Sequence, residues 1–514
     1  MKIATAAEMR SIDAAAIGEY KIPGIVLMEN AGNAVARVVG EYLGGVRDKK
    51  ICIIAGKGNN GGDGYVAARQ LYNQGARIKV FLIGCLAEDL TGDARTNMDI
   101  LIQMGISINP VAAERDWDKA ELAFSLADCL VDALLGTGIY GELKPEFRQA
   151  VELVNKSGRP VVAVDIPSGV EADTGQIRTT AVWAIKTVTL GLFKPGLLLY
   201  PGAGYAGEVV TADIGIPIEL LENPAIKQNW ITAEQVANIL PKRKNDAHKG
   251  TAGRVTVVAG SRGLTGAAAL ASMAALRAGA GLVTLCIAAS LNNIMEVKLT
   301  EVMTCPLPDR AGGGCLTTEA AAAVVAAAGR SGVLAIGPGL GTEEETQMAV
   351  RQILLETETP LVIDADALSA LAGQPELWQD LKALAVLTPH PGEMARLTGL
   401  TPGQVNADRI AVARQAAGEW GCIIVLKGAP TVVAFPDGEV YLNSTGNAGM
   451  ATGGTGDVLT GIIAGLIAQG LSSHEAAVAG VFVHGRAGDF AAENGKIGLV
   501  AGDLLQMLPK AISG

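Results

Sequence analysis

The sequence has little of what builds metal centres, disulfide frameworks or membrane spans. Its seven cysteines include no C-x-x-C pair, and its four histidines form no H-E-x-x-H motif, so neither a zinc site nor a disulfide scaffold is expected. No apolar run approaches about 18 residues, and the first twenty residues lack an unbroken apolar stretch. We therefore expect no membrane association and no export, and predict a cytoplasmic protein with reduced, mostly buried thiols.

Aromatic residues and positive charge are also scarce. Aromatics make up 4% of the chain, and 41 Lys and Arg face 52 Asp and Glu, for a formal charge of −11. Such a balance is poorly suited to nucleic-acid phosphates, so no nucleic-acid partner is predicted. By contrast, glycine is abundant at 65 residues and 49% of the chain is hydrophobic, which favours a soluble α/β protein.

The chain is long enough for more than one hydrophobic core. At 514 residues it exceeds the roughly 250–300 residues at which a single core stops growing. Short β-rich runs alternate with helical stretches in two series, from 50 to about 215 and from 254 to about 443, separated by a charged, proline-containing segment. We predict two tandem three-layer αβα domains, 1–220 and 221–514, each with a parallel sheet. A Pro436-Asp437-Gly438 hairpin signal near the end of the second series predicts an antiparallel pair there.

A glycine-rich segment, AGKGNNGGDGYVAAR, runs from Ala55 to Arg69 after an apolar run. We predict a strand, then a turn in which glycine adopts positive φ, then a helix from about Tyr65 whose free N–H groups hold phosphate. The segment is neither a P-loop nor a dinucleotide fingerprint. The alternative is a tight strand-to-helix turn without a ligand, although Asn59, Asn60 and Asp63 are more polar than such a turn requires.

Two further strand ends in the first half carry polar residues. VDALLGTGIYGE contains Asp132, and VDIPSG contains Asp165 and Ser168. The carboxyl ends of parallel strands share one edge of a sheet, so these segments can converge on one crevice. Asn60, Asp132 and Ser168 offer oxygen ligands suited to an alkali or alkaline-earth ion. Asp165 could equally be a helix cap or a turn residue.

The second half has a stronger signal, NAGMATGGTGDVLTG. Gly453 to Gly456 precede an apolar helix whose first turn contains Asp457. A carboxylate beside a phosphate cradle can take the proton of a substrate hydroxyl while backbone amides stabilise the transferring phosphoryl group. The alternative is a carboxylate that only stabilises the helix start, worth about 0.3–1 kcal/mol. TPHPGE with His390, KGAPT at 427–431 and GPGLG at 337–341 also end strand-like runs.

With these motifs assembled, the chain resembles the bifunctional NAD(P)H-hydrate repair enzymes along essentially its whole length. ENAG, GKGNNGGDG, GTGIYGE and DIPSG look like the family's epimerase half, and TGAA, GPGLG, TPHPGE, KGAPT and NAGMATGGTGDVLTG look like its dehydratase half. The resemblance implies a Rossmann-like N-terminal domain and a ribokinase-like C-terminal domain.

The resemblance also implies a pair of reactions on damaged cofactors, NADHX and NADPHX, in which water has added across a double bond of the reduced nicotinamide ring. The first half would interconvert the R and S epimers. The second would dehydrate the S form at the expense of ADP, giving AMP and phosphate, with magnesium accompanying the nucleotide. A potassium ion in the epimerase site and a homo-oligomer of four or more subunits are further expectations.

The family's functional residues carry over position by position. In the epimerase half they are Asp165 as acid/base, Asn60, Asp132 and Ser168 for potassium, and, for the substrate, Asn59, Asn60, Gly61, Gly62, Asp63, Gly136, Thr137, Gly138, Ile139, Tyr140, Gly141, Glu142 and Asp165. In the dehydratase half they are Ala267, Gly339, His390 and the catalytic Asp457 for the hydrate, and Lys427, Gly428, Ala429, Pro430, Thr431 and Gly456 for the nucleotide.

Two other functions fit parts of the pattern. The second half could be a ribokinase-type small-molecule kinase fused to a nucleotide-binding module, in which case a phosphorylated product would accumulate. Alternatively, the first half could be a non-enzymatic nucleotide-sensing or assembly module. Recovery of reduced-nicotinamide absorbance from a nicotinamide hydrate and ADP would distinguish all three.

Overall fold

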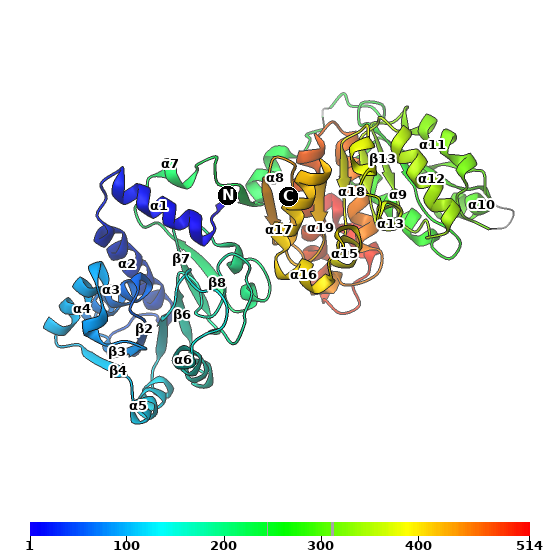
Figure 1. Cartoon of the computed structure of the whole chain (residues 1–514). Helices are drawn as coiled ribbons and strands as arrows, with labels where there is room; N and C mark the ends of the chain where they lie inside the picture. Colours follow the sequence, from blue (N-terminus) through cyan, green and yellow to red (C-terminus); the bar gives the residue numbers. More distant parts are fainter. Residues whose placement is uncertain (244, 310–312, 514) are drawn as a thin grey trace. The chain divides into compact units, whose positions relative to one another are not determined.

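The computed structural model describes residues 1–243, 245–309 and 313–513. The chain divides into two compact units (Figure 1), one of Lys2–Lys227 and one of Gln228–Gly514 together with Met1. This break lies inside the charged segment that separates the two series of strands. Whether the functional domains also meet at residue 220 stays a prediction.

The first unit is built on a seven-stranded sheet whose paired strands all run parallel, in the order β4-β3-β2-β5-β6-β7-β8. Its strands are β2 (Lys50–Ala55), β3 (Arg77–Ile83), β4 (Ser107–Val111), β5 (Cys129–Ala133), β6 (Val161–Val164), β7 (Lys186–Leu190) and β8 (Glu208–Ala212). The direction of strand order reverses between β2 and β5. This is the switch point at which open α/β sheets usually bind ligands.

Helices cover both faces of this sheet. Ile51 and Ile53 of β2 pack with residues of α1 to α4, while Cys52 and Ile54 face α5 and α6, as the two-residue repeat of a strand requires. The elements outside the sheet are β1 (Lys2–Ile3), α1 (Ala6–Gly18), α2 (Gly24–Leu43), α3 (Asn59–Asn73), η1 (Ala87–Asp89), α4 (Gly92–Gln103), α5 (Glu114–Ser125), α6 (Pro145–Lys156), η2 (Pro195–Leu197), η3 (Gly202–Gly204) and α7 (Ile218–Leu221).

The second unit has a larger mixed sheet in the order β9-β18-β17-β16-β15-β14-β13-β10-β11-β12. Only the pairs β16–β17 and β17–β18 are antiparallel among these strands. The strands are β9 (Gln228–Trp230), β10 (Arg254–Val258), β11 (Leu282–Ala288), β12 (Met303–Leu307), β13 (Val333–Ile336), β14 (Leu361–Ile363), β15 (Ala385–Leu387), β16 (Ile423–Leu426), β17 (Thr431–Ala434) and β18 (Val440–Asn443). The hairpin predicted at Pro436-Asp437-Gly438 is therefore confirmed.

This sheet is also covered on both faces. Val255 and Val257 of β10 pack with residues of α9, α18, α19 and α20, whereas Thr256 points the other way and donates to Ala327 O of α11. The helices are α8 (Ala233–Ile239), α9 (Thr265–Arg277), α10 (Ala289–Lys298), η4 (Thr318–Ala320), α11 (Ala321–Ala328), α12 (Glu344–Glu356), α13 (Ala365–Leu371), α14 (Leu377–Asp380), α15 (Pro391–Thr398), α16 (Pro402–Ala407), α17 (Arg409–Trp420), η5 (Ala448–Met450), α18 (Thr455–Ala468), α19 (Ser473–Ala491), η6 (Ala492–Asn494) and α20 (Ala501–Ser513). The expected α/β class, with parallel strands in both sheets, is confirmed.

The glycine-rich segment after β2 differs from its prediction. Helix α3 begins at Asn59, six residues before Tyr65, and none of the glycines from 56 to 64 has positive φ. Their role is close approach, because a Cβ on Gly61 would lie 2.1 Å from Gly56 O and one on Gly64 2.5 Å from Ala133 Cβ. The missing side chains let the start of the helix press against the ends of β2 and β5.

Candidate active sites

The first candidate site lies where β2, β5 and β6 end. Asn59 to Asp63 form the first turns of α3, and Gly58 precedes them as the N-cap residue. Gly136, after β5, lies against Asn60, because a Cβ on this glycine would come within 3.3 Å of Asn60 Cβ. The start of the helix and the segment after β5 are therefore neighbours.

Asn60, Asp132 and Ser168 form one hydrogen-bonded group. The Ser168 hydroxyl donates to Asp132 Oδ1 at 2.6 Å, and the Ser168 backbone N–H donates to Oδ2 at 2.8 Å. Asn60 Nδ2 donates to Leu135 O at 3.1 Å, and Leu135 N donates to Ser168 Oγ at 2.9 Å. Burial raises the pKa of Asp132 to about 6, even though the bonds from Ser168 and Leu134 favour the ionised form. These three residues come from three separate segments of the chain, and the fold brings them together.

Asp165 follows β6 with a φ of +64°, in the left-handed region that few non-glycine residues adopt. Its Oδ1 is ion-paired with Lys194 Nζ and accepts from Leu190 N at 3.0 Å and from Thr189 Oγ1 at 3.4 Å. Lys194 also donates to Leu190 O at 2.9 Å, and its side chain is only 1% exposed. Asp165 is therefore neither a helix cap nor an ordinary turn residue.

Two more carboxyl groups surround this ion pair. Asp63 is buried, and burial together with the Asp165 and Asp13 carboxylates raises its pKa well above the usual range. Burial also raises the pKa of Asp13, a half-buried residue of α1, and the Asp165 carboxylate adds to this while Lys194 opposes it. One buried lysine, Lys194, thus provides the positive charge near three carboxyl groups. Under these conditions at least one of them is stabilised as the neutral acid.

The segment Gly136–Glu142 is held by the loop that follows β6. Tyr140 is exposed, and its hydroxyl donates to Asp173 Oδ2 at 2.7 Å. Gly141, at a φ of +83°, donates its backbone N–H to Glu171 Oε1 at 3.2 Å. The segment is therefore fixed beside the ends of β5 and β6, with the Tyr140 ring accessible to a ligand.

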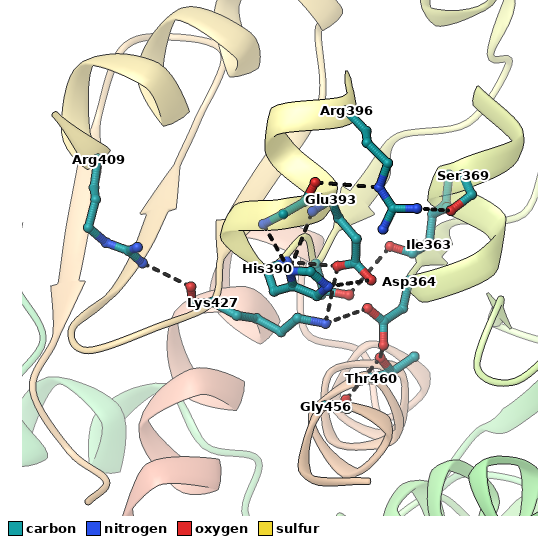
Figure 2. A network of polar contacts seen from close by, with 12 residues as sticks. Ile363, Asp364, Ser369, His390, Glu393, Arg396, Arg409, Lys427, Gly456 and Thr460 are labelled. Atoms are coloured by element: carbon teal, nitrogen blue, oxygen red, sulfur yellow. Dashed lines mark hydrogen bonds and ion pairs between the residues drawn. The ribbon is translucent and has the colours of Figure 1, made fainter. Parts of the chain in front are cut away.

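The second candidate site is centred on Lys427, at the end of β16 (Figure 2). Lys427 Nζ donates to Asp364 Oδ1 at 2.7 Å and lies 3.8 Å from Glu393 Oε2. Asp364, at the end of β14, is 1% exposed and accepts from Thr460 Oγ1 of α18 at 2.7 Å. Burial lowers the pKa of Lys427, but the carboxylates of Asp364 and Glu393 outweigh it and the net shift is upward. The lysine is therefore a fixed cation.

Asp457 lies in the first turn of α18, one residue from Gly456. A Cβ on Gly456 would lie 3.3 Å from Lys427 Nζ, so the helix start and the lysine are neighbours. Burial and the negative charge of Asp364 raise the pKa of Asp457 to about 7, despite the opposing charge of Lys427. A carboxylate that titrates near neutral pH is suited to general-base catalysis.

His390 has a structural role that the sequence did not indicate. It is the N-cap of α15, where its Nδ1 accepts from Gly392 N at 2.9 Å and Glu393 accepts from the His390 backbone N–H at 2.7 Å. Its Nε2 lies 3.4 Å from Glu393 Oε1. Because Nδ1 is an acceptor, the neutral ring carries its proton on Nε2. The imidazole is exposed, so it remains accessible to a ligand.

The KGAPT segment is fastened to a buried guanidinium. Arg409 of α17 donates through one nitrogen to Leu426 O at 3.1 Å, Lys427 O at 2.9 Å and Pro430 O at 3.2 Å. Burial lowers the pKa of Arg409 to about 10. A Cβ on Gly428 would lie 2.6 Å from this guanidinium. A side chain at position 428 would therefore displace the Arg409 guanidinium. Thr431 Oγ1 closes the turn by donating to Gly428 O at 3.0 Å.

Ala267 of α9 and Gly339, in the loop after β13, lie close together. A Cβ on Gly339, whose φ is +65°, would lie 3.0 Å from Ala267 Cβ. The same loop reaches the lysine network, because a Cβ on Gly337 would lie 1.8 Å from Asp364 O and Gly341 N donates to Asp366 Oδ2 at 2.8 Å. The predicted residues of the second half thus border one network at the carboxyl ends of the strands.

Several residues of these networks were not predicted, among them Lys194, Asp364, Glu393 and Arg409. Asp364 and Glu393 do follow strand-like runs, which was a usable signal, since Glu393 belongs to the TPHPGE motif. Lys194 and Arg409 carry no such signal, because the carboxylate partner of Lys194 lies 29 residues away and the backbone oxygens that Arg409 binds lie at least 17 residues away.

The structure adds two general findings. Within the described residues, no group of three or more His, Cys, Asp and Glu side chains is arranged to hold a metal ion. No helix in the same part of the chain is both long and apolar enough to cross a membrane.

Comparison with known proteins gives matches to both halves. Residues 24–196 match the family described as YjeF-related protein N-terminus, and residues 255–510 match NAD(P)H-hydrate dehydratase. Two relatives are named bifunctional NAD(P)H-hydrate repair enzyme Nnr. The one from Moorella thermoacetica is 47% identical over 99% of this chain and 96% of its own, and the one from Thermofilum pendens is 43% identical over 100% and 96%. A crystal structure of an ADP/ATP-dependent NAD(P)H-hydrate dehydratase from Bacillus subtilis, co-crystallised with ATP/Mg²⁺, is 33% identical and covers 55% of this chain and 97% of that one, with a TM-score of 0.48.

Proposed function

Since this chain belongs to the family of bifunctional NAD(P)H-hydrate repair enzymes, we propose which of its residues carry the two reactions and how. The first unit is the epimerase and the second the dehydratase of hydrated NADH and NADPH.

In the first unit we assign proton transfer to Asp165. The contacts that hold this carboxylate all end on Oδ1, so Oδ2 is the oxygen that meets the hydroxyl of the hydrated ring. As this proton leaves, the hydroxyl-bearing carbon becomes a carbonyl carbon and its bond to the ring nitrogen breaks. The nitrogen then adds to the opposite face of the carbonyl and the proton returns to the oxygen, which interconverts the R and S epimers. Asp63, whose neutral form is favoured by burial, is placed at the start of α3 to donate a hydrogen bond to the substrate.

Asp165→Asn tests this assignment. The substitution keeps size and hydrogen bonding but removes the base, so epimerisation is expected to fall about a hundred- to ten-thousandfold. Binding of the hydrate, measured by titration, should survive. Unchanged epimerisation would remove Asp165 from the mechanism.

The oxygen donors of Asn60, Asp132 and Ser168 fit a potassium ion. They supply a single carboxylate, which is too little charge for a tight divalent site but suits a monovalent cation. Asn60 uses its Nδ2 toward Leu135 O, which leaves the amide oxygen to the ion. The ion would neutralise the buried Asp132 and fix the start of α3 relative to the ends of β5 and β6.

In the second unit we propose that Asp457 activates the hydroxyl of the S epimer. The oxygen attacks the terminal phosphorus of ADP, its proton passes to Asp457, and AMP leaves. The new phosphate ester then departs as phosphate when the C–O bond breaks, the ring nitrogen supplies electrons, and loss of a neighbouring C–H proton restores the double bond. Lys427 and the backbone N–H of Gly456 stabilise the charge on the transferring group.

Lys427 to Thr431, fixed by Arg409, form the nucleotide side of this site, while Ala267, Gly339 and the Nε2–H of His390 form the hydrate side. Magnesium would neutralise the phosphates when bound. Asp364 already accepts bonds from Lys427 and Thr460 on its two oxygens, so the metal would be held mainly by phosphate oxygens and water.

The observation that carries the dehydratase proposal is Asp457, with a pKa of about 7, at a helix start beside Lys427. Incubating the protein with a nicotinamide hydrate and ADP, and following recovery of reduced-nicotinamide absorbance together with AMP and phosphate, tests it. A phosphorylated product that accumulates without dehydration would instead support a small-molecule kinase. Replacing ADP by ATP in the same assay tests the donor preference.

Two further proposals concern the protein in the cell. We expect a homo-oligomer of four or more subunits, which light scattering of the purified protein measures. We also expect the protein in the cytoplasm, and cell fractionation tests this.

A further inference from the structure

Two cysteines outside both candidate sites face each other across neighbouring strands. Cys286 of β11 and Cys305 of β12 are direct partners in the parallel register. Residues paired in this way point to the same face of a sheet. Their side chains are therefore neighbours, and each thiol shifts the pKa of the other. Neighbouring strands lie about 4.7–4.9 Å apart, within the Cα separation of about 4.4–6.8 Å that disulfides span.

The two thiols differ in their access to solvent. Leu285 and Ile287 of β11 point into the core of the second unit, so Cys286 lies on the opposite face and is fully buried. Cys305 is half-buried, on the strand that ends the sheet order. A small reagent can therefore reach Cys305 first and Cys286 only afterwards.

Their electrostatic surroundings give them different reactivities. The interaction with the Cys286 thiol and the positive charge of Arg330 lower the pKa of Cys305, although partial burial opposes this. The interaction with Cys305 and burial raise the pKa of Cys286. Thiolates, not thiols, attack peroxides and disulfides. Cys305 thus has the features of the attacking sulfur, with Cys286 as its partner.

We propose that Cys286 and Cys305 are a peroxide-reactive pair that closes to a reversible disulfide. The Cys305 thiolate attacks one oxygen of a hydroperoxide, the O–O bond breaks, and Cys305 becomes a sulfenic acid while water or an alcohol leaves. The Cys286 sulfur then attacks the sulfenic sulfur, its thiol proton leaves with the hydroxyl as water, and the S–S bond forms. With hydrogen peroxide, two thiols and one peroxide give one disulfide and two waters.

The pair differs from inert core cysteines in three respects. The two residues are aligned on neighbouring strands, one thiol is accessible to solvent, and a positive charge lies near it. Cys422, a buried thiol in the same unit, has none of them, because burial alone raises its pKa to about 12. The pair lies in β11 and β12, at one end of the sheet order, whereas Asp364 and Lys427 follow β14 and β16. Closure should therefore tie down the edge strand without removing a residue of the dehydratase site.

The test treats the full chain with hydrogen peroxide, blocks remaining thiols under denaturing conditions, and maps peptides by mass spectrometry. The expected result is one peptide pair joined through Cys286 and Cys305, lighter by two hydrogens than the reduced pair and restored by dithiothreitol. Both cysteines remaining as free thiols would overturn the proposal, and so would irreversible oxidation of Cys305 with Cys286 still reduced.

Two variants complete the test. Cys286→Ser removes the resolving thiol, so Cys305 should accumulate as a sulfenic acid that dimedone traps, with no disulfide. Cys422→Ser is the matched control and should form the disulfide as the unmodified protein does. A Cys286→Ser protein in which dimedone labels Cys305 no more than other cysteines would contradict the assigned order of attack.

Discussion

Asp457 is the residue on which the dehydratase proposal depends most. Asp457→Asn should lower dehydration about a hundred- to ten-thousandfold, as loss of a general base does. Nucleotide affinity should stay the same or tighten, because a negative charge near the phosphates is removed while Gly456 and Lys427 remain. Steady-state dehydration and nucleotide titration measure the two quantities. Epimerisation by the same variant is the internal control, and near-normal dehydration would reduce Asp457 to a helix-start carboxylate.

The pKa of about 7 at Asp457 predicts a pH profile. Because the base must be ionised, dehydration kcat/KM should rise with pH to a plateau, with a midpoint near 7. Glu393→Gln removes a negative charge that raises this pKa, so the midpoint should move to lower pH by roughly a few tenths of a unit. The Gln side chain can still accept the His390 backbone N–H. An unchanged midpoint would show that the charge of Glu393 does not affect the pKa of the catalytic base.

The site residues that the sequence predicted lie within recognisable motifs. The residues that it missed lie outside such motifs or bind partners in other segments of the chain. Asn60, Asp132 and Ser168 lie in motifs at or just after strand ends, and hydrogen bonds join these motifs in the structure. Lys194 could not be found in this way, because its partner Asp165 is 29 residues away and its own segment has no motif. His390 was predicted as a residue of the hydrate site, and its capping role could be found only from the geometry of α15.

Among the secondary-structure elements, two of the strands that the sequence did not predict share one property. Neither β4 nor β12 was predicted; each ends its sheet as an edge strand, and each contains a proline, Pro110 and Pro306. Proline cannot donate to a ladder and is tolerated at edges. Edge strands are also less buried, so they lack the continuous apolar run by which β2 or β16 was recognised.

The buried Asp132 at the end of β5 leads us to expect that potassium stabilises the first unit in a pH-dependent way. Burial raises the pKa of Asp132 from 3.8 to about 6, so between these values the unfolded carboxyl ionises first and stability falls as pH rises. Above about pH 6 this penalty persists unless a cation offsets it. Potassium should therefore raise the melting temperature of the first unit at pH 8 and have little effect at pH 5. Scanning calorimetry in potassium and in tetramethylammonium measures this.

Asp132→Asn is the matched control, because it removes the charge while keeping the oxygen that accepts from Ser168. In this variant potassium and tetramethylammonium should behave alike at both pH values. The same potassium stabilisation in wild type at pH 5 and pH 8 would place the ion elsewhere.

At the scale of the whole molecule, each unit contains its own sheet, core and strand-end site. We expect fragments 1–227 and 228–514 to fold separately, the first with epimerase activity and the second binding adenine nucleotide and dehydrating the S epimer. Circular dichroism melting and the two assays measure this, with an equimolar mixture of fragments as control. A soluble 228–514 fragment that does not bind nucleotide would contradict the division.

The glycines before and within α3 make this part of the molecule intolerant of sequence change. A Cβ on Gly56 would lie 2.4 Å from Leu134 O and one on Gly61 2.1 Å from Gly56 O, while Gly58 has nothing within 4 Å and an ordinary φ of −86°. In a library randomised at these positions, selection for folded protein should return glycine alone at 56 and 61 and a broad mixture at 58. The glycines at 56 and 61 would then be required because any side chain there would clash with backbone oxygens. A ligand would be bound by the start of α3, which can occupy this position only because those side chains are absent.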